Sequence, residues 1–198
     1  MNVIIGHDKL EWWKINKFLY PNSIFISNYF DNIDWIKYHH CNKHGGIYNH
    51  INVKNMIIEA LEYEPLLINH SDSIILDDSI LKPDKFNFLY RSFSSIPYGF
   101  FLTIPSGYHN QCIDIIKNTS DNDHVETIIS KIINKYNNLI NIIQHTNNNM
   151  FYQGYEQYAN HPGNGYDIWF DDIKFLHTHN INRLNTFLQY YKVNINEN

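Results

Sequence analysis

The sequence predicts an α/β fold in which helices flank a single, mostly parallel central sheet. Three observations support this prediction. The chain opens with a strand, a helix and a second strand over residues 2–27, an order typical of parallel sheets covered by helices. Helical periodicity follows at residues 53–61. A short apolar run at residues 73–76 then ends in two adjacent carboxylates, Asp77 and Asp78.

Size and composition indicate one globular domain. The chain has 198 residues, of which 43% are hydrophobic, and its net charge is -5. This charge lacks the basic excess of most nucleic-acid-binding proteins, so we expect no nucleic-acid partner. No apolar stretch approaches the roughly 20 residues of a membrane span, and the N-terminus lacks the features of a secretory signal. We therefore expect no transmembrane segment and a cytoplasmic location.

The first 28 residues predict two strands joined by a helix. Residues 2–6 and 23–27 are the short apolar runs expected of buried strands. The intervening helix, residues 9–19, carries an apolar stripe: Trp12, Ile15 and Leu19. Loops that follow such strands commonly line a nucleotide site. Four residues are therefore candidate neighbours of a base and ribose: Gly6, His7, Ser27 and Asn28.

The second helix is predicted from a clean stripe of apolar side chains at helical spacing: Val53, Met56, Ile57, Ala60 and Leu61. We expect this stripe to lie in the core. Lys43 and Gly45 come shortly before the helix. Backbone amides at a helix start, together with a lysine, suit an anion such as a diphosphate.

The acidic pair at the end of residues 73–76 is the main candidate for chemistry. Ligands gather at the carboxyl ends of strands in open α/β sheets. Carboxylates there can hold a divalent cation, which in turn can hold a diphosphate. Because neighbouring residues of an extended chain point to opposite faces, only one of Asp77 and Asp78 would face the ligand directly. The alternative is a pair of solvated acids in a turn.

This order of features resembles the metal-binding region of nucleotide-sugar glycosyltransferases of the A-type fold, and most closely the lipopolysaccharide-type glycosyltransferases. In that family a Gly and a His precede the helix, and an acidic triplet closes the strand. Here Gly45 and His50 precede the helix, and residues 76–79 read Leu-Asp-Asp-Ser. Ser79 replaces the third acid of the triplet. The resemblance covers residues 43–83 and is looser from there to the C-terminus.

The resemblance implies a Rossmann-like glycosyltransferase that moves a sugar from a nucleoside-diphosphate sugar to a hydroxyl of a glycan, lipid-linked or protein acceptor. It implies Mn²⁺ or Mg²⁺ as cofactor, with Asp78 as the direct metal ligand and Asp77 and His50 beside the donor. A late carboxylate would act as base, and a late histidine would complete the metal shell. The candidates for these two roles are Asp171 or Asp172, and His177 or His179.

We expect one domain over residues 1–198, with a nucleotide-sugar half at about 1–105 and an acceptor half at about 106–198. The remaining elements follow from local patterns. They are a helix or loop at 86–93, a strand at 97–105, a helix from 112, a long helix at 123–143 and a closing helix at 181–191.

Two other functions remain open at this point. His39-His40, the glycines at 45 and 46, and Asn52 loosely resemble a His-Asn-His metal-dependent nuclease. Against this hypothesis, the chain is acidic, and residues 49–61 predict a helix where such a module has a hairpin. Alternatively, the chain is a non-catalytic member of the glycosyltransferase fold that binds a carbohydrate or a protein partner, which Ser79 would favour.

Overall fold

The computed structural model describes residues 1–6, 9–39, 50–79, 81–90, 101–144, 168–170, 174–178 and 180–195. The chain divides into two compact units. The larger unit comprises Met1–Ser71 and Leu81–Gln144, and the smaller unit comprises Asp72–Ile80 and His145–Asn198. The larger unit contains the main sheet, and the smaller unit contains a separate three-stranded sheet.

The main sheet has the strand order β3-β2-β1-β4-β7. Its first four strands are parallel, and β7 is antiparallel to β4. The strands are β1 (Asn2–Ile5), β2 (Ile24–Ser27), β3 (Lys37–Tyr38), β4 (Leu67–His70) and β7 (Phe101–Thr103). The α/β class and a mostly parallel central sheet are thereby confirmed for the described residues.

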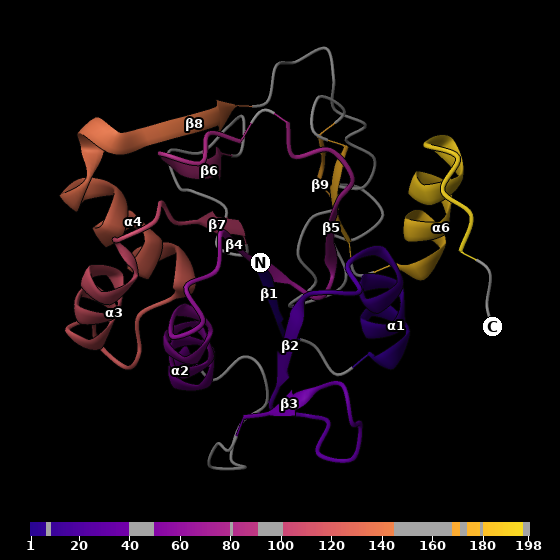
Figure 1. Cartoon of the computed structure of the whole chain (residues 1–198), viewed down its shortest axis with the longest axis horizontal. Helices are drawn as coiled ribbons and strands as arrows, with labels where there is room; N and C mark the ends of the chain where they lie inside the picture. Colours follow the sequence, from indigo (N-terminus) through magenta and orange to yellow (C-terminus); the bar gives the residue numbers. More distant parts are fainter. Residues whose placement is uncertain are drawn as a thin grey trace, which may run out of the picture. The chain divides into compact units, whose positions relative to one another are not determined.

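The two crossover helices of this sheet lie on its opposite faces (Figure 1). From β1 the chain moves outward to β2 and β3, and then returns to place β4 on the other side of β1. Because parallel crossovers are right-handed, this reversal puts α1 (Leu10–Leu19) and α2 (His50–Leu61) on different faces. Side chains of β1 alternate accordingly: Ile4 packs with Trp13 of α1, whereas its neighbours Val3 and Ile5 pack with α2.

The apolar stripe predicted for α2 is confirmed, because all five of its residues are buried. The buried face of α1 differs from the prediction. Trp12, Trp13 and Asn16 are buried, whereas Ile15 and Leu19 are only partly covered. The buried indole rings of Trp12 and Trp13 determine which face of α1 is buried. The Nδ2 of buried Asn16 donates two hydrogen bonds, whereas its Oδ1 has no hydrogen-bond partner among the described residues.

Two more strands extend the larger unit beyond β7. β6 (Phe86–Tyr90) pairs in parallel with β8 (Ile140–Gln144). Asn87 of β6 joins this pair to β7, because its backbone N–H and its side-chain Nδ2 both donate to Thr103 Oγ1, at 2.8 and 2.7 Å. Asn141 of β8 donates to Asn87 Oδ1 at 2.7 Å. Asn87 therefore connects all three strands.

These strands correct two sequence predictions. Residues 86–90 are a strand rather than a helix or loop, and the helix predicted over 123–143 ends early. The residues predicted to form one helix instead form α4 (Val125–Lys135), a short 3-10 turn (Asn137–Leu139) and β8. Consecutive asparagines disfavour a continuing helix, and the isoleucines beyond them are β-branched and favour a strand.

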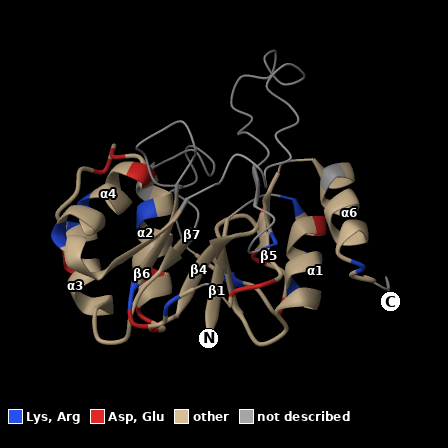
Figure 2. Cartoon of the chain, turned by 90° about the horizontal axis from the view of Figure 1, so that it is seen from above, with Lys and Arg blue, Asp and Glu red and all other residues tan. Residues whose placement is uncertain are grey.

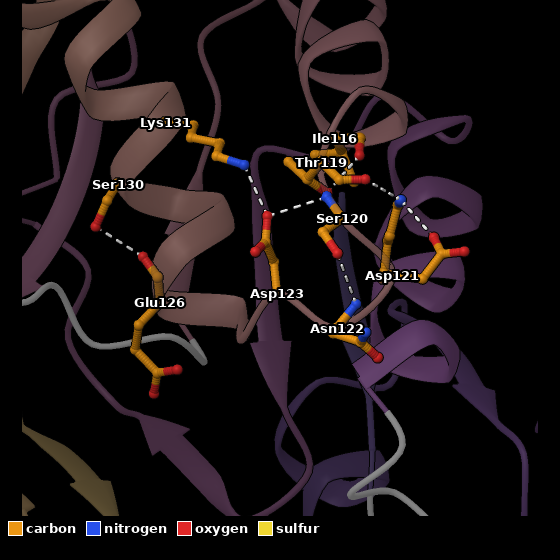
Figure 3. A network of polar contacts seen from close by, with 10 residues as sticks. Ile116, Thr119, Ser120, Asp121, Asn122, Asp123, Glu126, Ser130 and Lys131 are labelled. Carbon is orange, nitrogen blue, oxygen red and sulfur yellow. Dashed lines mark hydrogen bonds and ion pairs between the residues drawn. The ribbon is translucent and has the colours of Figure 1, made fainter.

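The helix predicted from 112 is observed as α3 (His109–Lys117), which shares one core with α2 and α4. A polar network fixes the turn between α3 and α4 (Figure 3). Lys131 Nζ and the backbone N–H of Ser120 both contact Asp123 Oδ2, at 2.7 and 3.1 Å. Buried Lys54 of α2 donates at 2.8 Å to both Thr119 O and Asp121 Oδ1. The network therefore holds the helices together.

The smaller unit contains an antiparallel sheet with the order β5-β10-β9. Its elements are β5 (Ser73–Ile75), β9 (Ile168–Phe170), β10 (Phe175–His177) and α6 (Ile181–Tyr190). The strand predicted at 73–76 therefore exists, but the prediction that it ends at the carboxyl edge of a parallel sheet is wrong. The sequence analysis missed β4, which occupies that position in the main sheet.

Among the described residues, no helix has the length and apolar character needed to cross a membrane. Acidic and basic positions are intermixed on α3, α4 and the turns around them (Figure 2).

Candidate functional site

The carboxyl edge of the main sheet has a topological switch point between β1 and β4. Strand order reverses there, because the chain builds outward from β1 through β3 before β4 joins on the other side. In open α/β sheets, ligands bind outside the carboxyl ends of the strands at such a point. Gly6 directly follows β1, and His70 ends β4 beside it, in register with Ile5.

Gly6 and His70 are in very close contact at the switch point. Gly6 has a φ of +128°, and a Cβ built on it would lie 2.4 Å from His70 Nε2. The His70 ring is 2% exposed, so it has little room to move aside. This position therefore needs glycine both for its backbone conformation and for the space that His70 occupies.

The end of β2 carries two polar side chains at the same edge. Ser27 is fully buried, and its Oγ accepts a hydrogen bond from the backbone N–H of Tyr29 at 3.0 Å. The Oδ1 atom of Asn28 is buried and has no hydrogen-bond partner among the described residues. Asn28 thus carries a buried acceptor at the end of β2, next to β1 in the sheet.

The end of β3 is bound to α2 by a cluster of charged side chains. Glu59 of α2 accepts from Lys37 Nζ at 2.7 Å and also contacts His39 Nδ1. Lys37 donates as well to the hydroxyl of Tyr63. Burial raises the pKa of Glu59, but the hydrogen bonds from Lys37 and His39 outweigh burial, so this pKa lies below its usual range. The cluster stabilises the β3–α2 connection when Glu59 is ionised.

Replacing Glu59 with glutamine should therefore make the protein less stable in a pH-dependent manner. A lowered folded-state pKa contributes stability above the unfolded-state pKa of about 4.3 and loses it as pH falls through the folded-state value. We expect E59Q to lower the unfolding free energy by about 1 kcal/mol at pH 7, since Lys37 is half exposed. Urea unfolding at several pH values between 7 and 3.5 measures this, with the exposed Glu62→Gln, in the turn directly after α2, as control. If the difference in unfolding free energy between wild type and E59Q stayed constant below pH 4, the role of the ionised carboxylate would be contradicted.

The smaller unit holds a buried polar cluster of Asp72, Ser73 and His177. Asp72 Oδ1 lies 3.2 Å from His177 Nδ1. Ser73 Oγ lies 3.1 Å from the same nitrogen and 3.5 Å from Asp72 Oδ1. All three residues are at most 2% exposed. A buried carboxylate beside an imidazole is costly unless the pair has a specific partner or a function.

Backbone pairing between β5 and β10 sets the geometry of this cluster. Ser73 is in register with His177. At one end of the pairing, the N–H of Thr178 donates to Asp72 O at 3.1 Å, and at the other end Leu76 N–H donates to Lys174 O at 3.0 Å. The chain returns 104 residues later to bring His177 to Ser73, so this pairing cannot be read from local sequence.

The predicted acidic pair lies in an exposed turn beyond β5. Asp77 Oδ1 accepts from the backbone N–H of Ser79 at 3.0 Å, and Asp77 Oδ2 lies 3.8 Å from Lys174 Nζ. Hydrogen bonds from the Ser79 side chain and backbone hold the pKa of Asp77 below its usual range. Asp78 is exposed. This local geometry is that of a turn-forming acid.

The structure places only some of the remaining predicted residues. Gly6, Ser27 and Asn28 lie at the ends of β1 and β2, and His177 lies in the buried cluster of the smaller unit. His50 begins α2, but its side chain is outside the described part. The other predicted site residues lie outside the described residues: His7, Lys43, Gly45, Asp171, Asp172 and His179.

Asp72 is the functional candidate that the sequence analysis missed. It follows the end of β4 by two residues and is the first carboxylate after that strand. β4 belongs to the parallel part of the main sheet. The signal that could have identified it is the run Leu-Ile-Asn-His at 67–70, which is short and half polar. The adjacent acids at 77 and 78 gave a more conspicuous pattern.

Asp72 and His177 fit the ligand chemistry of Mn²⁺ or Mg²⁺ in part. A carboxylate oxygen and a neutral imidazole nitrogen are both suitable ligands for Mn²⁺, whereas Mg²⁺ prefers oxygen. Their 3.2 Å separation is close to the roughly 3.0 Å between neighbouring ligands bound at about 2.1 Å to one ion. No group of three or more His, Cys, Asp or Glu side chains surrounds an ion site in the described part. Two protein ligands are sufficient where phosphates of a substrate complete the shell.

A cavity of about 10 Å³ lies in the larger unit between the sheet, α2 and α4. Apolar side chains dominate its lining, which includes Ile5, Val53 and Ile129, and His70 lies at its wall. The volume is close to the minimum for one water molecule and far below the roughly 300 Å³ of a small-molecule site. This cavity therefore does not hold a nucleotide.

Comparisons with known proteins returned no relatives of this chain. No protein-family model matches the sequence, no curated protein is significantly similar to it, and no solved structure matches its fold significantly. The candidate residues therefore rest on the geometry of the chain itself.

Proposed function

We propose that this protein is a glycosyltransferase that moves a sugar from a nucleoside-diphosphate sugar to a hydroxyl acceptor. The single observation that carries the proposal is the buried pair of Asp72 and His177, in which Asp72 Oδ1 lies 3.2 Å from His177 Nδ1. Asp72 follows β4 by two residues. In this proposal Asp72 replaces Asp78 as the carboxylate that binds the divalent cation, and His177 keeps its predicted role.

The topology of the larger unit supports the nucleotide part of the proposal. Its switch point lies between β1 and β4, and nucleotides commonly bind at such a point in open α/β sheets. Asn28 Oδ1 is a buried acceptor without a partner among the described residues. An acceptor of this kind suits an N–H of a base or a hydroxyl of a ribose.

The residues of the smaller unit support the chemical part. Asp72 and His177 would hold Mn²⁺ or Mg²⁺, which would offset the negative charge that develops on the leaving nucleoside diphosphate. Ser73 Oγ lies 3.1 Å from His177 Nδ1, and this contact would be exchanged for the metal bond when that nitrogen holds the cation. The acceptor hydroxyl loses its proton during transfer, and Asp171 and Asp172 stay candidates for the base.

A screen of sugar nucleotides by thermal shift tests this function. UDP-, GDP- and other nucleoside-diphosphate sugars are added with and without Mn²⁺. Ligand at 100 times its dissociation constant should stabilise the fold by about 2.7 kcal/mol, which raises Tm by several degrees. The rise should be larger with Mn²⁺ present. If no sugar nucleotide raised the Tm, the proposal would be contradicted.

The same samples separate the alternative functions. Hydrolysis of the bound sugar nucleotide distinguishes an enzyme from a non-catalytic carbohydrate-binding or partner-binding protein of the same fold. Nicking of plasmid DNA in the presence of metal would instead favour a nuclease. The observed helix α2 counts against that last alternative, because buried Asn52 lies on this helix rather than in a hairpin.

A further inference from the structure

We infer that Ser73 is the third protein ligand of the cation proposed for Asp72 and His177, a role that rests on the proposed function. The three donor atoms are Asp72 Oδ1, Ser73 Oγ and His177 Nδ1. Asp72 Oδ1 lies 3.2 Å from the imidazole nitrogen, and Ser73 Oγ lies 3.1 Å from that nitrogen and 3.5 Å from the carboxylate oxygen. The three atoms therefore form a nearly equilateral triangle of two oxygens and one nitrogen within the smaller unit.

This triangle has the dimensions of one face of an octahedral metal shell. Neighbouring ligands in such a shell are about 3.0 Å apart when each lies about 2.1 Å from the ion. All three observed distances lie within about 0.5 Å of that value. A serine hydroxyl is an established oxygen ligand of Mg²⁺ in phosphate-binding loops. The described part has no group of three His, Cys, Asp or Glu side chains around an ion site, so the hydroxyl is the third ligand that this site offers.

The strand pairing explains why the three side chains meet. Ser73 and His177 are directly opposite in the antiparallel pair of β5 and β10, so their side chains share one face of the sheet. Asp72 precedes β5 and lies in a turn. The strict alternation of strand side chains therefore does not apply to it, and its carboxylate can join Ser73 on the same face. The N–H of Thr178 donates to Asp72 O at 3.1 Å and ties this turn to the end of β10.

A cation satisfies these atoms better than protons do. The ionised carboxylate has no proton, and the hydroxyl and Nδ1 carry at most one each, so at most two protons serve three contacts. All three residues are at most 2% exposed, and an incompletely bonded polar atom is costly when buried. A cation accepts a lone pair from all three atoms at once. A carboxylate, a hydroxyl and an imidazole suit Mn²⁺, and an octahedral ion keeps three further positions for phosphate oxygens and water.

Replacement of Ser73 by alanine and by cysteine in the full chain tests this role. In S73A we expect the Mn²⁺ dissociation constant, measured by electron paramagnetic resonance, to rise at least about tenfold, since loss of even an outer-shell partner costs about 10–100-fold. In S73C the soft thiolate should shift the preference from Mn²⁺ toward Cd²⁺ by at least about tenfold. Cd²⁺ bound to this thiolate should also add a sulfur-to-metal charge-transfer absorption in the ultraviolet. Wild type, which has two cysteines of its own, supplies the reference spectrum.

Thr178→Val is the matched control for the loss of the hydroxyl. Thr178 is fully buried in the same unit, and its Oγ1 accepts from the N–H of Asn180 at 3.0 Å. T178V thus removes a buried hydroxyl outside the triangle and should leave the Mn²⁺ affinity within about twofold of wild type. The melting temperature of each variant without metal shows whether the fold is retained.

The outcomes separate this inference from the proposed function. An S73A variant that binds Mn²⁺ as wild type does, a T178V variant that loses as much affinity as S73A, or a folded S73C variant without the added absorption would overturn the role of Ser73. Stabilisation of wild type by a sugar nucleotide with Mn²⁺ would still support the proposed function. If wild type responds to no sugar nucleotide, the proposed function fails, and the Cd²⁺ absorption of S73C still judges the triangle. Should S73C not fold, Ser73→Thr takes its place. It keeps the hydroxyl and should retain Mn²⁺ binding, and a loss equal to that of S73A would overturn the inference.

Discussion

Asp72→Asn is expected to weaken Mn²⁺ binding by about 100-fold or more and to remove metal-dependent turnover of a sugar nucleotide. Asparagine keeps the size of the side chain but removes its negative charge. Loss of an outer-shell partner typically costs 10–100-fold in metal affinity, so loss of a charged ligand should cost at least as much. Titration of Mn²⁺ followed by electron paramagnetic resonance measures the affinity, and release of nucleoside diphosphate measures turnover.

Asp78→Asn is the matched control for this variant. Asp78 is exposed in the turn after β5, so its substitution should leave the Mn²⁺ affinity within about twofold of wild type and should change stability by less than about 0.5 kcal/mol. The melting temperature of both variants without metal shows whether the fold is retained. The opposite pattern, with D78N impaired and D72N active, would return the cation to the acidic pair at 77 and 78.

Gly6→Ala is expected to lower the free energy of unfolding by about 3 kcal/mol or more. Two costs combine at this position. Alanine at a φ of +128° costs about 1–2 kcal/mol, and overpacking in a tight core costs about 1–3 kcal/mol. The overpacking arises because the new Cβ would lie 2.4 Å from His70 Nε2. Unfolding by urea, followed by circular dichroism, measures the loss.

Gly107 offers a control that separates the two costs. It also has a positive φ, +86°, but a Cβ there would meet no atom within 4 Å. Gly107→Ala should therefore cost only about 1–2 kcal/mol of backbone strain. The double variant G6A/H70A should recover part of the loss, because the shorter side chain at 70 vacates the space. Equal losses for G6A and G107A would show that the His70 contact does not constrain Gly6.

The parts of the fold that sequence predicts are those with strong local periodicity. Strands β1 and β2 and helix α2 have patterns that only one secondary structure satisfies. The predicted helix at 123–143 failed beyond residue 135 because its isoleucine stripe is compatible with either state. Its end was decided by pairing of β8 with β6, a long-range contact. Strand β4 was missed because two of its four residues are polar.

The candidate site was harder to predict than the fold. The strand pattern predicted that Gly6, Ser27 and Asn28 lie at the ends of parallel strands, and the structure places them there. Asp72 was not found, because its partner His177 lies more than a hundred residues away and pairs with it through β5 and β10.

Anomalous scattering at the manganese edge tests the central claim most directly. Crystals of the full chain grown with Mn²⁺ and a nucleoside diphosphate would be measured on both sides of the edge. The proposed function predicts one strong peak within bonding distance of Asp72 and His177, about 2.0–2.3 Å from a carboxylate oxygen and an imidazole nitrogen. A peak beside Asp77 or Asp78, or a bound nucleotide with no manganese at Asp72, would contradict it.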